Sequence, residues 1–383
     1  MQLSTRIQNV RASSTVAFNT RAAEMRRQGI DVIAMTAGEP DFQPPAHVFD
    51  AAREALDLGL TKYTPAEGTH ALREAICAKH LRENGWSAEP GQVIVSTGGK
   101  QVLYNAFQAL IDPGDEVILI APYWVSYPAQ VEVAGGVVVP VEARAENGFV
   151  PDPDEVAAAF SERTKVLVLN TPSNPTGAVY PREVVEALAA LARERGVWLI
   201  SDDLYEHLIY EGEFTPVQPL YPEGTLTVHG ASKGYALTGW RIGWGVGPQP
   251  LIKAMTRLQG QVTSGANALA QHATVAALNE VDKTAAFQAE TRAAYIERRG
   301  ILVEGLNRLG LATPMPAGAF YAMADLTPID PDEGTAALRL LEEANVGVVP
   351  GTDFLAPGFA RFSYATSTEN VREALRRIEA LLG

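Results

Sequence analysis

Lys233 lies between Ser232 and Gly234, in a loop that we expect directly after the apolar run at residues 226–229. An amine that attacks a carbonyl must be accessible yet desolvated, because desolvation lowers its pKa and frees its lone pair. Arg241 follows eight residues later, and its planar guanidinium suits a phosphate dianion. Together the lysine and the arginine indicate a site for an aldehyde that carries a phosphate.

Other residues suited to chemistry follow other apolar runs. They are Gly98, Gly99 and Lys100 after the run at 93–96, Tyr123 and Trp124 after 116–120, Asn174 after 165–170 and Asp202 after 197–201. Ligands of open α/β sheets bind at the carboxyl ends of the strands. Arg241 comes at the start of the last run, 242–246, and it reaches the same edge if that strand is antiparallel. The sequence therefore predicts that these residues meet at one edge of one sheet.

Each of these signals also has an ordinary structural explanation. Gly98 and Gly99 can form a simple turn, or they can open a helix at 101–110 whose N-terminus receives a phosphate. Asn174 begins a good turn sequence, and Asp202 could merely cap a helix. Trp124 could belong to the core or could stack on a planar heterocycle. The residues alone leave both explanations open.

The apolar runs predict a mostly parallel sheet. They lie at residues 93–96, 116–120, 136–141, 165–170, 197–201, 226–229 and 242–246. They are rich in Val, Ile and Leu and alternate little, as strands buried on both faces do. Helical stretches separate them, such as residues 181–195, which Gly196 ends. This order predicts an α/β fold in which helices sandwich a mostly parallel seven-stranded sheet.

The pattern changes after residue 286. A long helix is expected at 286–309, strands near 318–324, 346–349 and 361–365, and a final helix at 368–382 whose apolar stripe includes Leu382. We predict three parts: an N-terminal arm and small-domain segment at 1–40, a large cofactor-binding domain at 41–285 and a smaller α/β C-terminal domain at 286–383.

Composition excludes several classes of protein. The 383 residues carry a formal net charge of −14, which argues against a nucleic-acid partner. No apolar run is long enough for a membrane span, and no signal peptide is recognisable, so a cytoplasmic location is expected. The single cysteine, Cys77, cannot form an internal disulfide, and we expect a core thiol and no metal site.

The motifs together resemble the class I aminotransferases of fold type I, which use pyridoxal 5′-phosphate (PLP). The resemblance is carried by Ser-Lys-x-Tyr-x-Leu-Thr-Gly-Trp-Arg-Ile-Gly from Ser232, Asn-Pro-Thr-Gly from Asn174 and Asp-x-x-Tyr from Asp202. It extends over nearly the whole chain, from residues 36–42 to 361–366, and is strongest to the bacterial aspartate aminotransferase subgroup, some of whose members accept prephenate. As a set, these motifs are highly specific.

The resemblance implies a role for each cofactor-binding residue. Lys233 matches the lysine that bonds the cofactor's aldehyde and then moves the proton, and Asp202 matches the carboxylate that pairs with the pyridine nitrogen. Tyr205 and Asn174 match residues that contact the cofactor's 3-oxygen. The remaining positions are Trp124, which stacks on the ring, and the phosphate ligands Gly99, Lys100 (through its backbone), Ser232 and Arg241.

The resemblance also implies a substrate and a partner. Arg361 matches the arginine that grips the substrate's α-carboxylate, with Asn174, the backbone of Gly38, and Trp124 also at the substrate. Lys100 matches a lysine associated with the side-chain carboxylate of acidic substrates, although a solvated helix-start lysine is the ordinary alternative. Tyr63 matches a tyrosine that reaches the phosphate of the other subunit, which implies a homodimer with shared sites.

The function expected from the resemblance is amino transfer between aspartate or glutamate and a 2-oxo acid, 2-oxoglutarate or oxaloacetate, with ping-pong kinetics. Prephenate, aromatic, kynurenine or alanine specificity remains an alternative, as does a PLP carbon–sulfur lyase. A ligand-sensing regulator of this fold would join a DNA-binding segment to it, and no basic helix-turn-helix-like segment is recognisable before residue 36. Asp203 is expected to be a supporting or surface carboxylate, and His207 a packing or surface residue.

Overall fold

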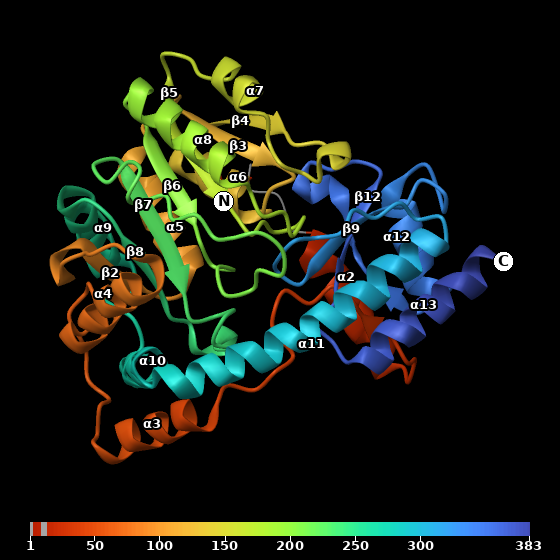
Figure 1. Ribbon diagram of the computed structural model, residues 1–383, viewed down its shortest axis with the longest axis horizontal. Helices are drawn as coiled ribbons and strands as arrows, with labels where there is room; N and C mark the ends of the chain where they lie inside the picture. Colours follow the sequence, from red (N-terminus) through yellow and green to blue (C-terminus); the bar gives the residue numbers. More distant parts are fainter. Residues whose placement is uncertain (1–2, 9–13) are drawn as a thin grey trace.

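The computed structural model describes residues 3–8 and 14–383, and its largest sheet has seven strands in the order β2-β8-β7-β6-β5-β3-β4 (Figure 1). These strands are β2 (Val93–Ser96), β3 (Glu116–Ala121), β4 (Val137–Glu142), β5 (Thr164–Asn170), β6 (Trp198–Asp202), β7 (Thr225–Gly230) and β8 (Gly243–Val246). Every neighbouring pair is parallel except the two that contain β8, which runs antiparallel to β2 and β7. The predicted mostly parallel seven-stranded sheet is confirmed.

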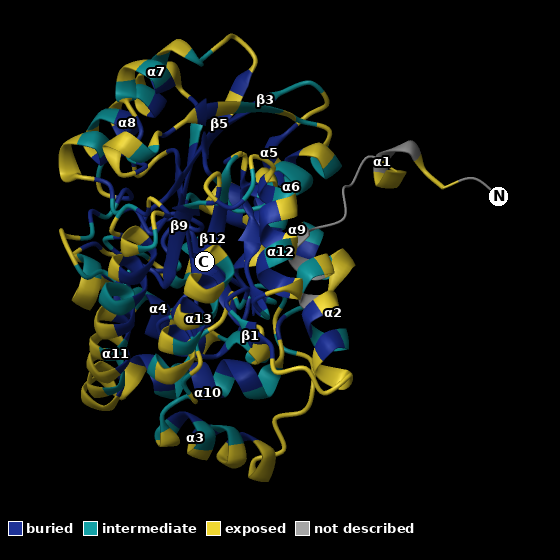
Figure 2. Ribbon diagram, turned by 90° about the vertical axis from the view of Figure 1, so that its right-hand side faces the viewer, coloured by how far each residue is buried: buried dark blue, intermediate teal, exposed yellow. Residues whose placement is uncertain are grey.

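Helices cover both faces of this sheet, because alternate residues of each strand point to opposite sides. In β3, Val117 and Leu119 pack in a core with α5 (Gly99–Leu110) and α9 (Gln249–Val262). Ile118 and Ile120 of the same strand pack in a second core that includes residues of α8 (Arg182–Arg195). Figure 2 shows the central strands dark blue beneath helices whose outer surfaces are exposed.

A third core packs two more helices against the edge of the sheet. It joins α4 (His70–Asn84) and α10 (Ala268–Asn279) to residues of β2 and β8. The other described helices are α1 (Thr5–Gln8), α2 (Ser14–Arg27), α3 (Ala46–Asp57), α6 (Ser126–Ala134), α7 (Pro153–Ala158), α11 (Val281–Arg308), α12 (Glu333–Glu342) and α13 (Thr368–Leu382). Among these described helices, none has the length and apolar character to cross a membrane.

Two smaller sheets lie beyond the large one, on the right of Figure 1. One orders β11 (Val349–Pro350), β12 (Phe359–Ser363) and β9 (Tyr321–Asp325), and the other pairs β1 (Ile33–Ala34) in parallel with β10 (Val346–Gly347). The predicted helix at 368–382 is confirmed, although Leu382 is exposed and does not join its apolar stripe. The long helix begins five residues earlier than expected and crosses residue 285 without a break. The division into three parts stays a prediction.

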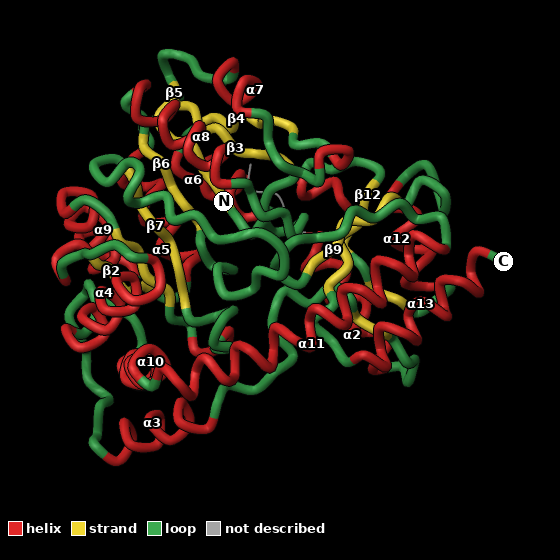
Figure 3. The backbone as a smooth tube through the Cα atoms, in the orientation of Figure 1, coloured by secondary structure: helices red, strands yellow, loops and turns green. Residues whose placement is uncertain are grey.

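A close approach of two backbones brings the start of β8 to the end of β2. A Cβ at Gly243 would collide with the backbone of Gly98 and Gly99. Glycine at position 243 therefore lets the turn between β2 and α5 lie directly against the segment that carries Arg241. Figure 3 shows the strands of the large sheet giving way to loops at their ends.

Candidate active site

Lys233 lies in the loop after β7, and its Nζ donates a hydrogen bond to the carbonyl oxygen of Gly38. Burial lowers the pKa of Lys233 to about 7, and the positive charges of Arg361 and Arg241 act in the same direction. The carboxylates of Glu39 and Asp202 oppose this shift. The neutral, nucleophilic form of the amine is therefore accessible near neutral pH.

Asp202 ends β6, the strand next to β7, and is buried. The hydroxyl of Tyr127 donates to its Oδ2 at 2.6 Å. Burial raises the pKa of Asp202 to about 6, against the effect of that hydrogen bond. Its Oδ1 is buried and has no hydrogen-bond partner within the described part of the chain. A buried carboxylate oxygen without a partner calls for a donor, such as a protonated ring nitrogen.

The guanidinium of Arg241 lies against the turn before α5. Gly98 has φ +84°, and a Cβ there would lie 2.6 Å from Nη2 of Arg241. The helix begins at Gly99, two residues before the expected position, so its first backbone N–H groups face this turn. Arg241 itself precedes β8 and has a left-handed backbone conformation with φ 58°. Ser232, which directly precedes Lys233 in the sequence, is buried.

Arg241 carries a charge that no acidic side chain neutralises. Its Nη1 donates to the carbonyl oxygen of Thr238 at 2.8 Å, and no carboxylate in the described ranges forms an ion pair with it. Helix N-termini and guanidinium groups both favour anions. This part of the site is suited to a phosphate group.

Arg361, on β12, is buried at 3% exposure. Its Nη1 donates to Oδ1 of Asn174 at 2.9 Å, and its Nη2 donates to the carbonyl oxygen of Thr36 at 3.1 Å. The ring of Tyr321 lies 4.4 Å from the guanidinium carbon. Within residues 3–8 and 14–383, no carboxylate pairs with this guanidinium, and its Nε has no partner. A buried cation in this state is suited to an incoming carboxylate.

Asn174 contacts both Arg361 and the end of β5. Its backbone N–H donates to Oδ1 of Asn170 at 2.8 Å, and Nδ2 of Asn170 donates to the carbonyl oxygen of Asp202 at 2.9 Å. The ends of β5 and β6 are thereby tied together beside Lys233. Because Oδ1 of Asn174 faces Arg361, its Nδ2 is left to donate elsewhere.

Aromatic and lysine side chains also contact one another around Lys233 and Lys100. The hydroxyls of Tyr205 and Tyr321 lie 3.0 Å apart, and Lys233 Nζ lies 5.8 Å from the centre of the Tyr205 ring. Lys100 Nζ lies 5.0 Å from the centre of the Trp124 ring. Partial burial and the charge of Arg241 lower the pKa of Lys100. Lys100 thus belongs to the same electrostatic cluster as Arg241.

Two aromatic residues of the site, Tyr127 and Tyr321, were not predicted from the sequence, and Asp203 was predicted only in part. Tyr127 orients Asp202, and Tyr321 stacks on Arg361, yet both read as ordinary core aromatics; only the closeness of Tyr127 to Trp124 in sequence could have singled it out. Asp203 is buried and accepts a 2.5 Å hydrogen bond from Ser201, so the surface alternative for it was wrong.

Two further expectations fall outside the assembled site. Tyr63 is 95% exposed and does not join the other predicted residues within this chain. Cys77 is only half-buried beside the core that joins α4 and α10 to the sheet, and burial raises the pKa of its thiol to about 11. Its thiol is therefore unreactive near neutral pH.

The residues present fit pyridoxal 5′-phosphate. The partnerless Oδ1 of Asp202 suits the protonated pyridine nitrogen, the surface formed by Gly98 and Arg241 suits the phosphate, and the Lys233 amine suits the aldehyde. With the seven-stranded sheet and its antiparallel β8, this arrangement defines the fold type I class of PLP enzymes.

Comparison with known proteins identifies the family within that class. The model of aminotransferase class I and II matches residues 30–378, and the chain belongs to this family. It is 56% identical over 381 residues to the aspartate/prephenate aminotransferase of Thermus thermophilus, covering 100% of this chain and 99% of that one. It is 42% identical over 396 residues to the aspartate aminotransferase of Geobacillus stearothermophilus, with 100% and 99% covered.

A solved structure agrees closely with this fold. The aspartate aminotransferase from Thermus thermophilus with maleate superposes with a TM-score of 0.98 at 55% identity, and the match covers 100% of both chains. The chain is therefore a PLP-dependent aminotransferase of the aspartate subgroup. When bound, PLP supplies an aldehyde for amines and a protonated ring that withdraws electrons from the substrate's α-carbon.

Proposed function

We propose that this aminotransferase moves an amino group between an acidic L-amino acid, aspartate or glutamate, and a 2-oxo acid, 2-oxoglutarate or oxaloacetate. Two half-reactions would alternate, giving ping-pong kinetics. The observation that carries the proposal is the guanidinium of Arg361, which is buried without an acidic partner in the described chain. Such a charge is costly unless a substrate carboxylate binds it.

The site residues divide into cofactor and substrate ligands. Oδ1 of Asp202 would keep a proton on the pyridine nitrogen, and Tyr127 orients that carboxylate through Oδ2. Nδ2 of Asn174 and the hydroxyl of Tyr205 would hold the cofactor's 3-oxygen, and Trp124 would hold the ring. The phosphate ligands in this proposal are Gly99, the backbone of Lys100, Ser232 and Arg241.

Lys233 is the proposed acid–base group. Its pKa of about 7 lets Nζ take a proton from the substrate's α-carbon and release it again at neutral pH. The contact of Nζ with the Gly38 carbonyl keeps the amine next to the segment that also supplies Thr36 to Arg361. The amine and the carboxylate-binding guanidinium are thus held by one stretch of backbone.

Lys100 is proposed to bind the second carboxylate of an acidic substrate. Its ammonium lies over Trp124 and is repelled by Arg241, so an anion placed between these groups would relieve an unfavourable charge pair. A cation in the first turn of a helix is also unfavourable without a nearby anion. Both facts support a dicarboxylate rather than an apolar substrate.

Prephenate is a second candidate as the amino acceptor. The relative that shares 56% identity with this chain is named an aspartate/prephenate aminotransferase, as is one from Cereibacter sphaeroides at 46% identity. Prephenate carries two carboxylates, so Arg361 and Lys100 would serve it as they serve oxaloacetate. The two acceptors are therefore alternatives for one site.

The same proposal includes a homodimer with shared sites. Tyr63 is 95% exposed, and three leucines before it, Leu56, Leu58 and Leu60, are also exposed. A second copy that covers this segment would bring Tyr63 to the partner's phosphate site. A cytoplasmic location is likewise proposed, in line with the acidic composition and the single cysteine.

A panel of half-reactions tests the substrate class. The PLP-loaded enzyme is mixed separately with aspartate, glutamate, alanine, phenylalanine and kynurenine, and the amino form of the enzyme is mixed with oxaloacetate or prephenate. The change in cofactor absorbance gives each rate. Aspartate and glutamate are expected to react about tenfold faster or more, because only they use both cations. A faster reaction with phenylalanine or kynurenine would contradict the proposal.

A further inference from the structure

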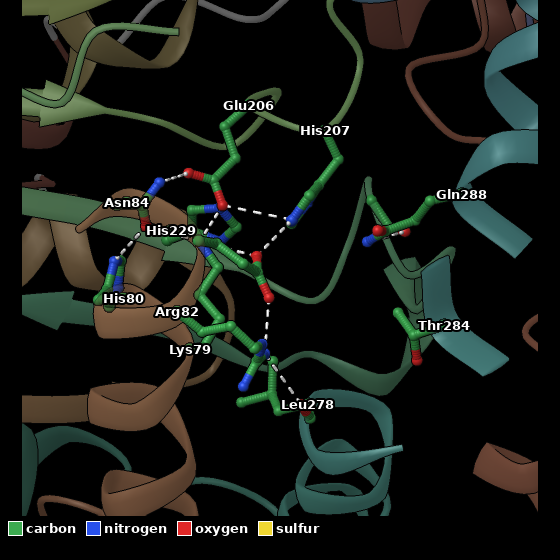
Figure 4. Close-up of polar contacts among 12 residues, drawn as sticks. Lys79, His80, Arg82, Asn84, Glu206, His207, His229, Leu278, Thr284 and Gln288 are labelled. Carbon is green, nitrogen blue, oxygen red and sulfur yellow. Dashed lines mark hydrogen bonds and ion pairs between the residues drawn. The ribbon is translucent and has the colours of Figure 1, made fainter. Parts of the chain in front are cut away.

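A second group of polar side chains, buried at Lys79, His80 and His229, lies close to the residue that follows Lys233, and the proposed reaction does not use it. We call it the Glu206 cluster; its members are Lys79, His80, Glu83, Asn84, Glu206, His207 and His229 (Figure 4). It joins the C-terminal half of α4 to the loop after β6 and to the end of β7.

The carboxylate of Glu206 is the centre of this cluster. Lys79 Nζ, which is fully buried, contacts its Oε1, and Asn84 Nδ2 donates to its Oε2 at 2.9 Å. Nε2 of His229 lies 2.9 Å from Oε1. Burial alone would raise the pKa of Glu206, but Lys79 and His229 lower it well below its usual range. Both charges of the ion pair are therefore maintained in the interior.

A hydrogen bond fixes the tautomer of His229. The backbone N–H of Gly230 donates to Nδ1 of His229 at 2.7 Å, so Nε2 carries the proton that faces Glu206. Burial lowers the pKa of His229 to about 4, so this imidazole is neutral at pH 7. Glu206, His207 and His229 offer ligand-type atoms within 4.8 Å of one another. Glu206 already accepts hydrogen bonds from Lys79 Nζ and Asn84 Nδ2, which favours a hydrogen-bond network over a metal site.

The cluster reaches the catalytic loop through His207. Nε2 of His207 lies 3.0 Å from Oε2 of Glu83 and 3.4 Å from Oε1 of Glu206. The other side of the ring lies against Gly234, where an added Cβ would collide with Nδ1 and lie 3.0 Å from Cγ. The ring of Tyr235 packs edge-on at 5.3 Å. His207 is thus held by carboxylates on one side and supports Gly234 on the other.

Gln288 supports the same peptide from α11. Its Nε2 donates to the carbonyl oxygen of Gly234 at 3.3 Å. A cavity of about 340 Å³ borders His207, Tyr235 and Gln288, so few other side chains fill this side of the loop. Seven and ten residues further along α11, Tyr295 and Arg298 hold Asp41, three residues after Gly38. Helix α11 therefore contacts both the loop that carries Lys233 and the segment whose Gly38 carbonyl oxygen accepts a hydrogen bond from Lys233 Nζ.

We propose that His207 and Gln288 are positioning residues for Lys233. They fix the Gly234 peptide, and the other members of the Glu206 cluster fix His207. A lysine side chain is flexible, so the place of its amine depends on a fixed backbone. A displacement of about 1 Å can cost roughly 100-fold in rate. This inference rests on Lys233 being the reactive amine of the proposed function.

A steric rescue tests the His207 contact. Gly234 has no left-handed φ, so Gly234→Ala adds only the Cβ that collides with His207. In the PLP-loaded enzyme we expect kcat to fall roughly tenfold or more, with KM for aspartate changed less than about twofold. Gly234→Ala/His207→Ala should recover about threefold or more of that loss, because the collision is removed. If the double variant is as slow as Gly234→Ala or slower, the contact does not position the lysine.

The Gln288 contact is tested with a control on the same helix. Gln288→Ala removes the donor to Gly234, whereas Glu290→Ala changes an exposed residue of α11. Amide hydrogen exchange of the loaded enzyme reports the loop directly, since Ala236 N donates to Lys233 O and Leu237 N to Ala231 O. We expect faster exchange at these two amides and a roughly threefold lower kcat in Gln288→Ala only. Equal exchange in both variants would overturn the inference.

The two proposals fail in distinguishable ways. If Lys233→Ala retains the visible absorption of bound PLP, the assignment of the reactive amine is wrong and the positioning inference falls with it. If that band is lost but Gly234→Ala and Gln288→Ala behave like Glu290→Ala, only the positioning inference is wrong.

Discussion

The active site and the Glu206 cluster are two sets of buried charges that differ in how the charges are paired. Lys79 is fully buried against a carboxylate, and each histidine beside it has a defined donor or acceptor. Lys233 and Arg361 share the candidate site without an ion pair to any carboxylate of the described chain. Paired charges stabilise a fold, whereas charges left without partners are available to ligands.

The largest effect is expected at Lys233. Lys233→Ala removes both the amine that bonds the aldehyde and the base that moves the proton, so activity should fall by about four orders of magnitude or more. Loss of the visible cofactor band and steady-state kinetics measure this. Lys253→Ala, an exposed lysine on α9, is the matched control. A visible band that survives in Lys233→Ala would show that the reactive amine lies elsewhere.

Substitutions in the Glu206 cluster should change the free energy of unfolding. Glu206→Gln removes the buried carboxylate that pairs with Lys79 and leaves only Glu83, 3.5 Å from its Nζ, as a counter-charge, which should cost about 3–5 kcal/mol in the free energy of unfolding. Denaturant unfolding measures this cost. Lys79→Met/Glu206→Gln, which removes both charges, should recover a large part of it. If the double variant is less stable than Glu206→Gln, the ion pair is not the source of the effect.

Arg361 should respond in substrate binding. Arg361→Lys keeps a charge but loses the planar fork that faces a carboxylate, so kcat/KM for aspartate should fall roughly 10- to 100-fold. Its thermal midpoint should stay near that of the wild type, because the guanidinium has no acidic partner to lose in the described chain. Unchanged kcat/KM would contradict its role.

The smallest effect is a change in selectivity at Lys100. Lys100→Ser should lower kcat/KM for aspartate about tenfold and leave alanine and phenylalanine within about twofold, since only aspartate carries the second carboxylate. Parallel half-reactions with the three amino acids give the ratio directly. Equal losses for all three would show that Lys100 does not read that carboxylate.

Much of the fold could be predicted from the sequence because local rules determine it. Strands buried on both faces read as apolar runs, and β2 was predicted at its observed residues 93–96. The position of Arg241 at the site depended on an antiparallel last strand, which the sequence left open and β8 confirms. Helix ends were less accurate, because a glycine pair does not reveal which residue begins the helix.

The features that could not be predicted depend on contacts between segments that are far apart in the sequence. Lys79 is a helical lysine that would ordinarily face solvent, and only the fold brings Glu206, 127 residues away, to its amine. Tyr127 reads as a core aromatic because its hydroxyl partner is on another strand. His207 was expected to be a packing or surface residue, and its position between two carboxylates and Gly234 follows only from the folded loop.

Competitive labelling of Lys233 and Lys79 tests the contrast most directly. In cofactor-free protein, a trace amine reagent is applied across pH 5 to pH 10, and the labelling of Lys233 and Lys79 is measured by mass spectrometry. Lys233 should label with a midpoint near its pKa of about 7, because only the neutral amine reacts. Lys79, fully buried against Glu206, should stay unlabelled while the protein is folded. A Lys233 midpoint near 10.5, or labelling of Lys79 as fast as Lys233, would contradict the account.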